Sequence, residues 1–152
     1  MRLHLSRPAR AEELQVVRRE LRRLLQGVGA SEDVIFQVLV ACGEACGNAI
    51  RHPIRPSRAA FEVAANANSE QVRVMVRDFG HWRHEPSTRD DPSGTGLRLM
   101  RSLMDDVQLK RTEGGTFVHM QRVLRRDVSR KDSVGSSVGR VSRLSRGIVE
   151  AR

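Results

Sequence analysis

The sequence predicts an α+β fold, a two-layer sandwich in which helices cover one face of a mostly antiparallel, mixed sheet. Two helical stretches with apolar stripes come first, and two hairpins with alternating apolar residues follow, separated by a loop and a short helix. These elements end near Leu124 of a 152-residue chain. Because about 124 residues suit one domain with a single core, we expect the folded domain to span 1–124.

Two helices are predicted before the first hairpin. Leucine and valine recur every three or four positions over 14–24, and two glycines then end this helix. Ser31 followed by Glu32 and Asp33 is typical of a helix N-terminus, with a capping hydroxyl and acids in the first turn. The apolar face continues until Pro53, which predicts a second helix over about 32–52.

The strands are predicted from residues that alternate between apolar and polar. The first hairpin has apolar residues at every second position over 61–65 and 72–76, with the polar residues 66–69 as its turn. A polar loop over 80–94 leads to a short helix over about 97–104. The second hairpin has strands over about 106–112 and 116–123 around a turn at 113–115.

Charge and aromatic content argue against some function classes. The chain has 27 Lys and Arg against 18 Asp and Glu, a net charge of +9, so binding to nucleic acid is one hypothesis, with steep salt dependence as its signature. Four Phe, one Trp and no Tyr are too few for recognition of single strands by base stacking. We therefore expect nucleic acid to be an unlikely partner.

The segment 125–152 differs in composition from the rest of the chain. It is basic and rich in serine and glycine, which predicts a disordered tail. Apolar residues between Val134 and Ile148 nevertheless recur at helical spacing with arginines on other sides. An alternative hypothesis is that the tail forms a basic amphipathic helix only on a partner.

No membrane span or export signal is expected. Gln37 and Glu44 interrupt the longest apolar stretch, and the first eight residues lack the apolar centre of a secretory signal. These observations favour a soluble, cytoplasmic protein. Cys42 and Cys46 are four residues apart with no further cysteine, which suits small core residues better than a zinc site or a redox pair.

Glu44, Asn48 and His52 follow each other at intervals of four residues, so they share one strip of the second predicted helix. One interpretation is a solvated helix face. The other is a catalytic strip, in which a carboxylate serves as general base and an amide oxygen joins the shell of Mg²⁺.

Two loop motifs also have a plain and a functional interpretation. Asp78 at a strand end is ordinary turn chemistry, but a carboxylate beside Gly80 can also accept a hydrogen bond from the amine of adenine. The stretch 93–97 precedes a predicted helix, so its amides can either start that helix or face phosphate.

The order and spacing of four motifs resemble the gyrase, Hsp90, histidine kinase and MutL ATPase superfamily, and within it most closely the anti-sigma factor serine/threonine kinases. The resemblance covers about residues 1–123 and implies the Bergerat-type ATP-binding fold. Its motifs are EACGNAIRH over 44–52, DFG over 78–80, GTGLRLM over 94–100 with LMD over 103–105, and GGT over 114–116.

The resemblance implies a role for each matching residue. Asn48 would hold the Mg²⁺ that bridges the ATP phosphates, and Glu44 would be the base that activates the attacking hydroxyl. Asp78 would accept from the adenine amine, with Gly80 against the ring and Thr116 supporting the same contact. The phosphates would be bound by backbone amides of Gly94, Thr95, Gly96 and Leu97.

The resemblance also implies an activity and partners. The protein would be an ATP-dependent serine/threonine kinase that phosphorylates a small anti-sigma-antagonist protein and binds a sigma factor. Relatives of this kind commonly form homodimers, for which 2–6 is a candidate edge strand. The alternative is a nucleotide-gated binding module that holds ATP without transferring phosphate. The chain departs from the usual pattern at 81–85, HWRHE, which concerns closure of the loop over the nucleotide.

Overall fold

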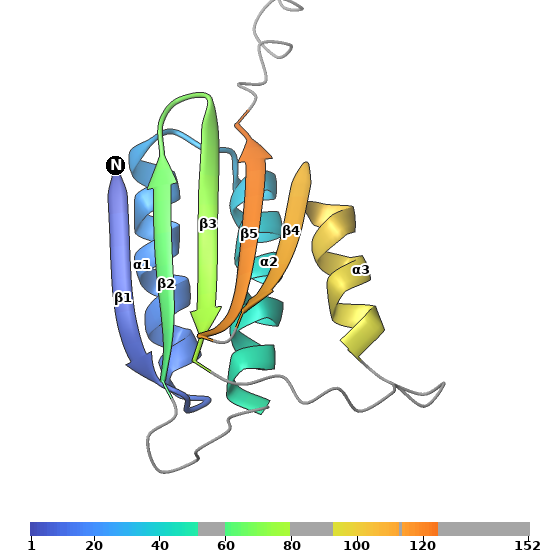
Figure 1. Cartoon of the computed structure of the whole chain (residues 1–152). Coiled ribbons are helices and arrows are strands. Elements are labelled where there is room, and N and C mark those ends of the chain that lie inside the picture. The colour runs from blue at the N-terminus through green and yellow to red at the C-terminus, as the bar shows by residue number, and fades with distance from the viewer. Residues whose placement is uncertain (52–59, 80–92, 113, 125–152) are drawn as a thin grey trace, which may run out of the picture.

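The computed structural model describes residues 1–51, 60–79, 93–112 and 114–124. Within them, three helices cover one face of a five-stranded sheet (Figure 1). Every neighbouring pair of strands in this part of the chain is antiparallel. The α+β sandwich predicted from the sequence is confirmed.

The chain order of the elements differs from their order in the sheet. The strands lie side by side as β1-β2-β3-β5-β4, so β5 inserts between β3 and β4, and β1 and β4 form the edges. The elements are β1 (Arg2–Pro8), α1 (Glu13–Gly27), α2 (Glu32–Arg51), β2 (Ala60–Ala67), β3 (Gln71–Asp78), α3 (Ser93–Leu103), β4 (Asp106–Thr112) and β5 (Gly115–Val123).

The predicted capping residues set the junction between α1 and α2. Gly29 adopts a φ of 75°, a conformation that favours glycine, and its amide donates to the carbonyl of Gln26 at 3.0 Å. Ser31 then accepts a hydrogen bond from the amide of Val34 on its Oγ, at 3.4 Å. This local chemistry places the start of α2 within a residue of the prediction.

The first hairpin turns later than the sequence predicted. Strand β2 continues through Ala67, which pairs with Val72, so residues 66 and 67 belong to the strand. Asn68 makes the turn, because its Oδ1 accepts from the amides of Glu70 and Gln71, both at 2.9 Å. An Asn side chain that satisfies two amides fixes the position of this turn.

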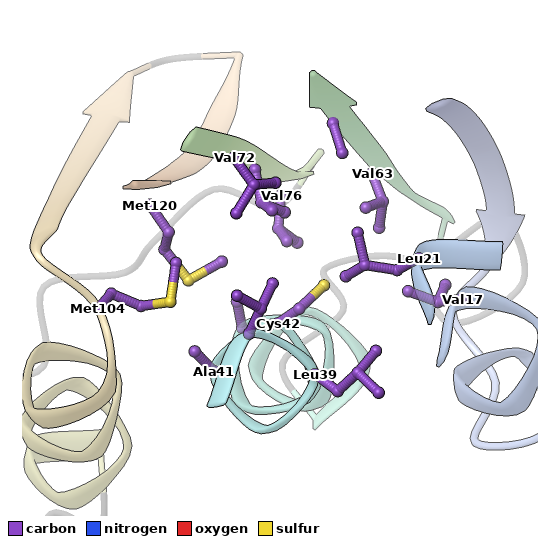
Figure 2. Close-up of a cluster of buried hydrophobic side chains, with 14 of the residues drawn as sticks. Val17, Leu21, Leu39, Ala41, Cys42, Val63, Val72, Val76, Met104 and Met120 are labelled. Atoms are coloured by element: carbon purple, nitrogen blue, oxygen red, sulfur yellow. The ribbon is translucent and has the colours of Figure 1, made fainter. Parts of the chain in front are cut away.

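The core lies between the sheet and α2, which runs behind the centre of the sheet (Figures 1 and 2). α2 is long and apolar enough to cross a membrane, but one side of it packs in the core. Figure 2 shows Cys42 of α2 between Leu21 of α1 and Met104, which follows α3. Both cysteines are buried, so their interpretation as core residues is confirmed.

Some sequence predictions concern residues outside the described part of the chain. These are the roles of His52 and Gly80, the departure at 81–85, and the disordered or amphipathic tail over 125–152.

Candidate functional site

Two helices and two strands each have one end at the same end of the molecule (Figure 1). α2 and β3 end there, and α3 and β5 begin there. Each carries one of the motifs noted in the sequence. The topology therefore brings motifs from residue 44 to residue 116 to the same end of the sandwich.

Glu44 and Asn48 lie on the strip of α2 that faces the start of α3. Both side chains are half-buried. A Cβ atom on Gly96 of α3 would lie 3.2 Å from Oε2 of Glu44 and 3.7 Å from Nδ2 of Asn48. Because only glycine leaves this space open, α3 approaches the polar strip closely. The strip therefore faces a neighbouring helix and is not simply a solvated face.

α3 begins at Ser93, four residues earlier than predicted, so Gly94, Thr95, Gly96 and Leu97 form its first turn. Glycine is a poor helix former, which is why the sequence placed the start later. The first four amides of an α-helix, here those of residues 93–96, have no partner within the helix, so this turn still has donors for an anion. The amide of Leu97 is the fifth, a position that bonds within the helix. Thr95 is exposed and Leu97 packs against the core.

Asp78 and Thr116 are paired residues at the ends of β3 and β5. The amide of Thr116 donates to Oδ1 of Asp78 at 3.2 Å, and the Thr116 side chain is buried. Two positions along each strand, Val76 and Val118 are buried in the core, so Asp78 and Thr116 lie on the face that the helices cover. The structure thus brings together two residues that the sequence separates by 38 positions.

The residue after Asp78 is fixed by a contact that the sequence analysis missed. The guanidinium of Arg77 lies 4.4 Å from the ring centroid of Phe79 and 4.9 Å from that of Phe117. Glu62 of β2 also lies 3.8 Å from this guanidinium. These cation–π contacts lie on the face of the sheet that no helix covers, and they stabilise the end of β3. The contact with Phe117 cannot be predicted unless the pairing of β3 with β5, which places Arg77 opposite Phe117, is already known.

A second missed residue contacts the polar strip directly. Arg51, the last residue of α2, donates from Nη2 to Oδ1 of Asn48 at 2.8 Å and from Nε to the carbonyl of Gly47 at 3.3 Å. The same Nη2 lies 3.9 Å from Oε2 of Glu44. The spacing of three residues from Asn48 is a signal for this contact that the sequence analysis did not use.

The donor set of the strip suits a hard divalent cation. Glu44 and Asn48 present a carboxylate and an amide oxygen, which are ligands that Mg²⁺ accepts along with water and phosphate. The amide oxygen already binds a cationic group, the guanidinium of Arg51. The residues therefore fit Mg²⁺ that takes one protein oxygen here and has water or phosphate oxygens as its other ligands.

A separate hollow of about 940 Å³ lies on the helix-free face of the sheet, with His4, Met75 and His119 among its lining residues. Neither Glu44 nor Asp78 lines it. This hollow is therefore a different surface from the motif-bearing end.

Comparison with known proteins identifies the domain. Residues 7–122 match the histidine kinase-like ATPase domain. The chain belongs to this family. The match covers all three helices and all five strands, except the last position of β5 and residues 2–6 of β1. The family resemblance predicted from the motifs is confirmed.

Curated relatives of this ATPase domain are serine-protein kinases named RsbW. One from Bacillus cereus and one from Bacillus anthracis are each 24% identical over 141 residues, which cover 84% of this chain and 88% of the relative. These relatives support the anti-sigma kinase branch of the family, at low identity.

Solved structures show the same fold. The RsbU and RsbW domains of Rv1364c from Mycobacterium tuberculosis match with a TM-score of 0.67 at 26% identity, over 83% of this chain and 33% of that one. The histidine kinase domain of a blue-light activated kinase from Erythrobacter litoralis matches with a TM-score of 0.53 at 20% identity, over 77% and 61%. The chain thus spans about a third and about three fifths of these two structures.

Proposed function

We propose that this ATPase-family domain is an ATP-dependent serine/threonine kinase of the anti-sigma type, acting in the cytoplasm on a small anti-sigma-antagonist protein and binding a sigma factor. The observation that carries the proposal is the approach of Gly96 to the Glu44–Asn48 strip, at the end of the sandwich where Asp78 and Thr116 also lie. The RsbW relatives support the choice of kinase and partners.

In this proposal, nucleotide binding uses both halves of the site. Asp78 accepts a hydrogen bond from the exocyclic amine of adenine, and the buried Thr116 supports that contact. Gly80 would lie against the ring, as the family resemblance implies. The free amides at the start of α3, over 94–96, donate to the phosphates.

The metal role falls to Asn48. Its Oδ1 would hold Mg²⁺, which when bound neutralises charge on the phosphates of ATP. The Asn48 side chain is half-buried, and its Nδ2 would lie 3.7 Å from a Cβ atom on Gly96, so the metal site would adjoin the turn of α3 whose amides would bind the phosphates.

In the chemical step, Glu44 is the general base. Its carboxylate accepts the proton of the acceptor serine or threonine hydroxyl as that oxygen bonds to the γ-phosphorus. The bond from the γ-phosphorus to the bridging oxygen breaks, and ADP leaves with the electron pair. The side chain is 35% exposed, so an acceptor side chain from a second protein can approach it.

The test uses labelled ATP with a candidate antagonist protein. We expect transfer of label to a serine or threonine, and we expect Glu44→Gln to lower the transfer rate by about 10²–10⁴-fold while ATP still binds. Glu70→Gln, at an exposed turn between β2 and β3, is the matched control and should leave transfer unchanged. ATP binding without transfer by the wild-type protein would favour the nucleotide-gated binding module instead.

A further inference from the structure

Arg51 makes contacts that a metal ion at Asn48 would need to replace. Its Nη2 donates to Oδ1 of Asn48 at 2.8 Å, the same amide oxygen that the proposed function assigns to Mg²⁺. The same nitrogen lies 3.9 Å from Glu44, so the guanidinium also neutralises part of the carboxylate charge. One positive group thus contacts both polar residues of the strip.

A cation and this guanidinium cannot share the amide oxygen. At separations of a few ångströms the two positive charges repel, and the guanidinium already takes one of the two lone pairs of Oδ1. Binding of a metal at Asn48 therefore requires Arg51 to move.

Arg51 is able to move at small cost. Its side chain is 60% exposed, and it is the last residue of α2. Water can therefore solvate the released guanidinium, and exposed ion pairs of this kind are weak. Among the described residues, the polar contacts of Arg51 all lie within seven residues on α2, so its release breaks no polar contact between the described elements.

We propose that Arg51 is an internal counter-cation that holds the Glu44–Asn48 strip in the metal-free protein and is displaced when Mg²⁺ binds with ATP. This inference rests on the proposed function. It makes Arg51 a competitor of the metal, so the Mg²⁺ concentration needed for nucleotide binding is set partly by this residue.

The test measures binding of a fluorescent ATP analogue as MgCl₂ is titrated, for the full chain. Arg51→Met keeps the length of the side chain but removes the competing charge. We expect the half-saturating Mg²⁺ concentration to fall by about five- to tenfold, the size that one charge-assisted hydrogen bond supports at a largely exposed site. Arg51→Lys keeps the charge without the guanidinium fork and should give an intermediate value.

Arg101→Met is the matched control, because Arg101 is an exposed arginine in the last turn of α3. An equal fall in that variant would assign the effect to overall charge and overturn the proposal. Unchanged Mg²⁺ dependence in Arg51→Met would also overturn it. Weaker analogue binding in Arg51→Met would do the same, since Arg51 would then assist the nucleotide.

The two proposals fail in different ways. If the wild-type protein binds the analogue with Mg²⁺ and Arg51→Met behaves identically, the proposed function stands and the counter-cation role is wrong. If the wild-type protein binds no ATP analogue at any Mg²⁺ concentration, the proposed function and the inference built on it are both wrong.

Discussion

Gly115 packs against the backbone of Asp78 so closely that any side chain there would collide with it. A Cβ atom on Gly115 would lie 2.9 Å from the carbonyl carbon of Asp78 and closer still to its oxygen. Gly115 also adopts a φ of 124°, which other residues rarely adopt. This contact sets the spacing of β3 and β5 at the point where Thr116 meets the Asp78 carboxylate.

Gly115→Ala should therefore destabilise the fold markedly. We expect the free energy of unfolding to fall by about 2–4 kcal/mol, since backbone strain and a collision with main-chain atoms add. Gly29→Ala is the matched control: Gly29 has a φ of 75°, but nothing lies within 4 Å of its Cβ position. Chemical denaturation of both variants should show the larger loss for Gly115→Ala. Equal losses of stability in the two variants would mean that the collision of a Cβ atom at residue 115 with the Asp78 backbone adds nothing to the backbone strain.

Gly96→Ala should separate binding from stability. A methyl group at 3.2 Å from Oε2 of Glu44 displaces a side-chain end, which can yield, and alanine favours the helix by about 1 kcal/mol. We expect the free energy of unfolding to stay within about 1 kcal/mol of wild type while ATP affinity falls several-fold. Calorimetry with ATP, alongside denaturation, measures both.

Gly43→Ala is the control for helix propensity, because its Cβ would lie 3.5 Å from the guanidinium of Arg18, in ordinary contact. It should leave ATP affinity unchanged. Wild-type affinity in Gly96→Ala would show that the approach of α3 to the strip is not needed for the nucleotide.

The bounds of α2 and of the strands were predicted better than the start of α3, where Gly96 lies. α2 and the strands carry their own signals, a capping serine and alternating apolar residues, so their predicted bounds lie close to those observed. The start of α3 was missed because Gly96 weakens a helix locally, and its reason is a contact with α2. Helix propensity depends on neighbouring residues in the sequence, so it cannot predict a contact between α3 and α2.

The order of the strands was also beyond sequence reasoning. β4 and β5 form a hairpin, but nothing in their alternation says that β5 rather than β4 lies beside β3. That order decides that Thr116 meets Asp78. The resemblance to a family suggested a common role for these two residues, whereas periodicity alone would have left them unrelated.

Asp78→Asn should impair recognition of adenine more than the fold. Asn retains an oxygen that can accept from the Thr116 amide, so the contact at 3.2 Å can persist. The amide group adds donors where adenine presents its amine. We expect ATP affinity to fall at least tenfold and pyrophosphate affinity to change little, as measured by calorimetry. Glu62→Gln, on the opposite face of the sheet, is the control. Equal losses for both ligands would make Asp78 a fold residue only.

The buried cysteines predict a dependence of stability on alkaline pH. The Sγ atoms of Cys42 and Cys46 lie 3.9 Å apart, and neither cysteine is in a disulfide. The hydrogen bond with the Cys42 thiol, together with burial, raises the pKa of Cys46 well above its ordinary value. In the unfolded chain a cysteine titrates near pH 8.5, so above that pH the unfolded state loses its proton while the folded state keeps it.

The free energy of unfolding should consequently be unaffected by Cys46 below about pH 8 and fall as the pH rises from about 8.5, by up to about 1.4 kcal/mol per pH unit from this group. Cys46→Ala removes the titrating thiol, so its stability should decline less steeply over the same range, in urea titrations with reductant present. Val38→Ala is the control, because it shortens another buried side chain of α2 without removing a titrating group and should keep the wild-type slope. Parallel slopes for wild type and Cys46→Ala would show that the folded and unfolded thiols titrate alike.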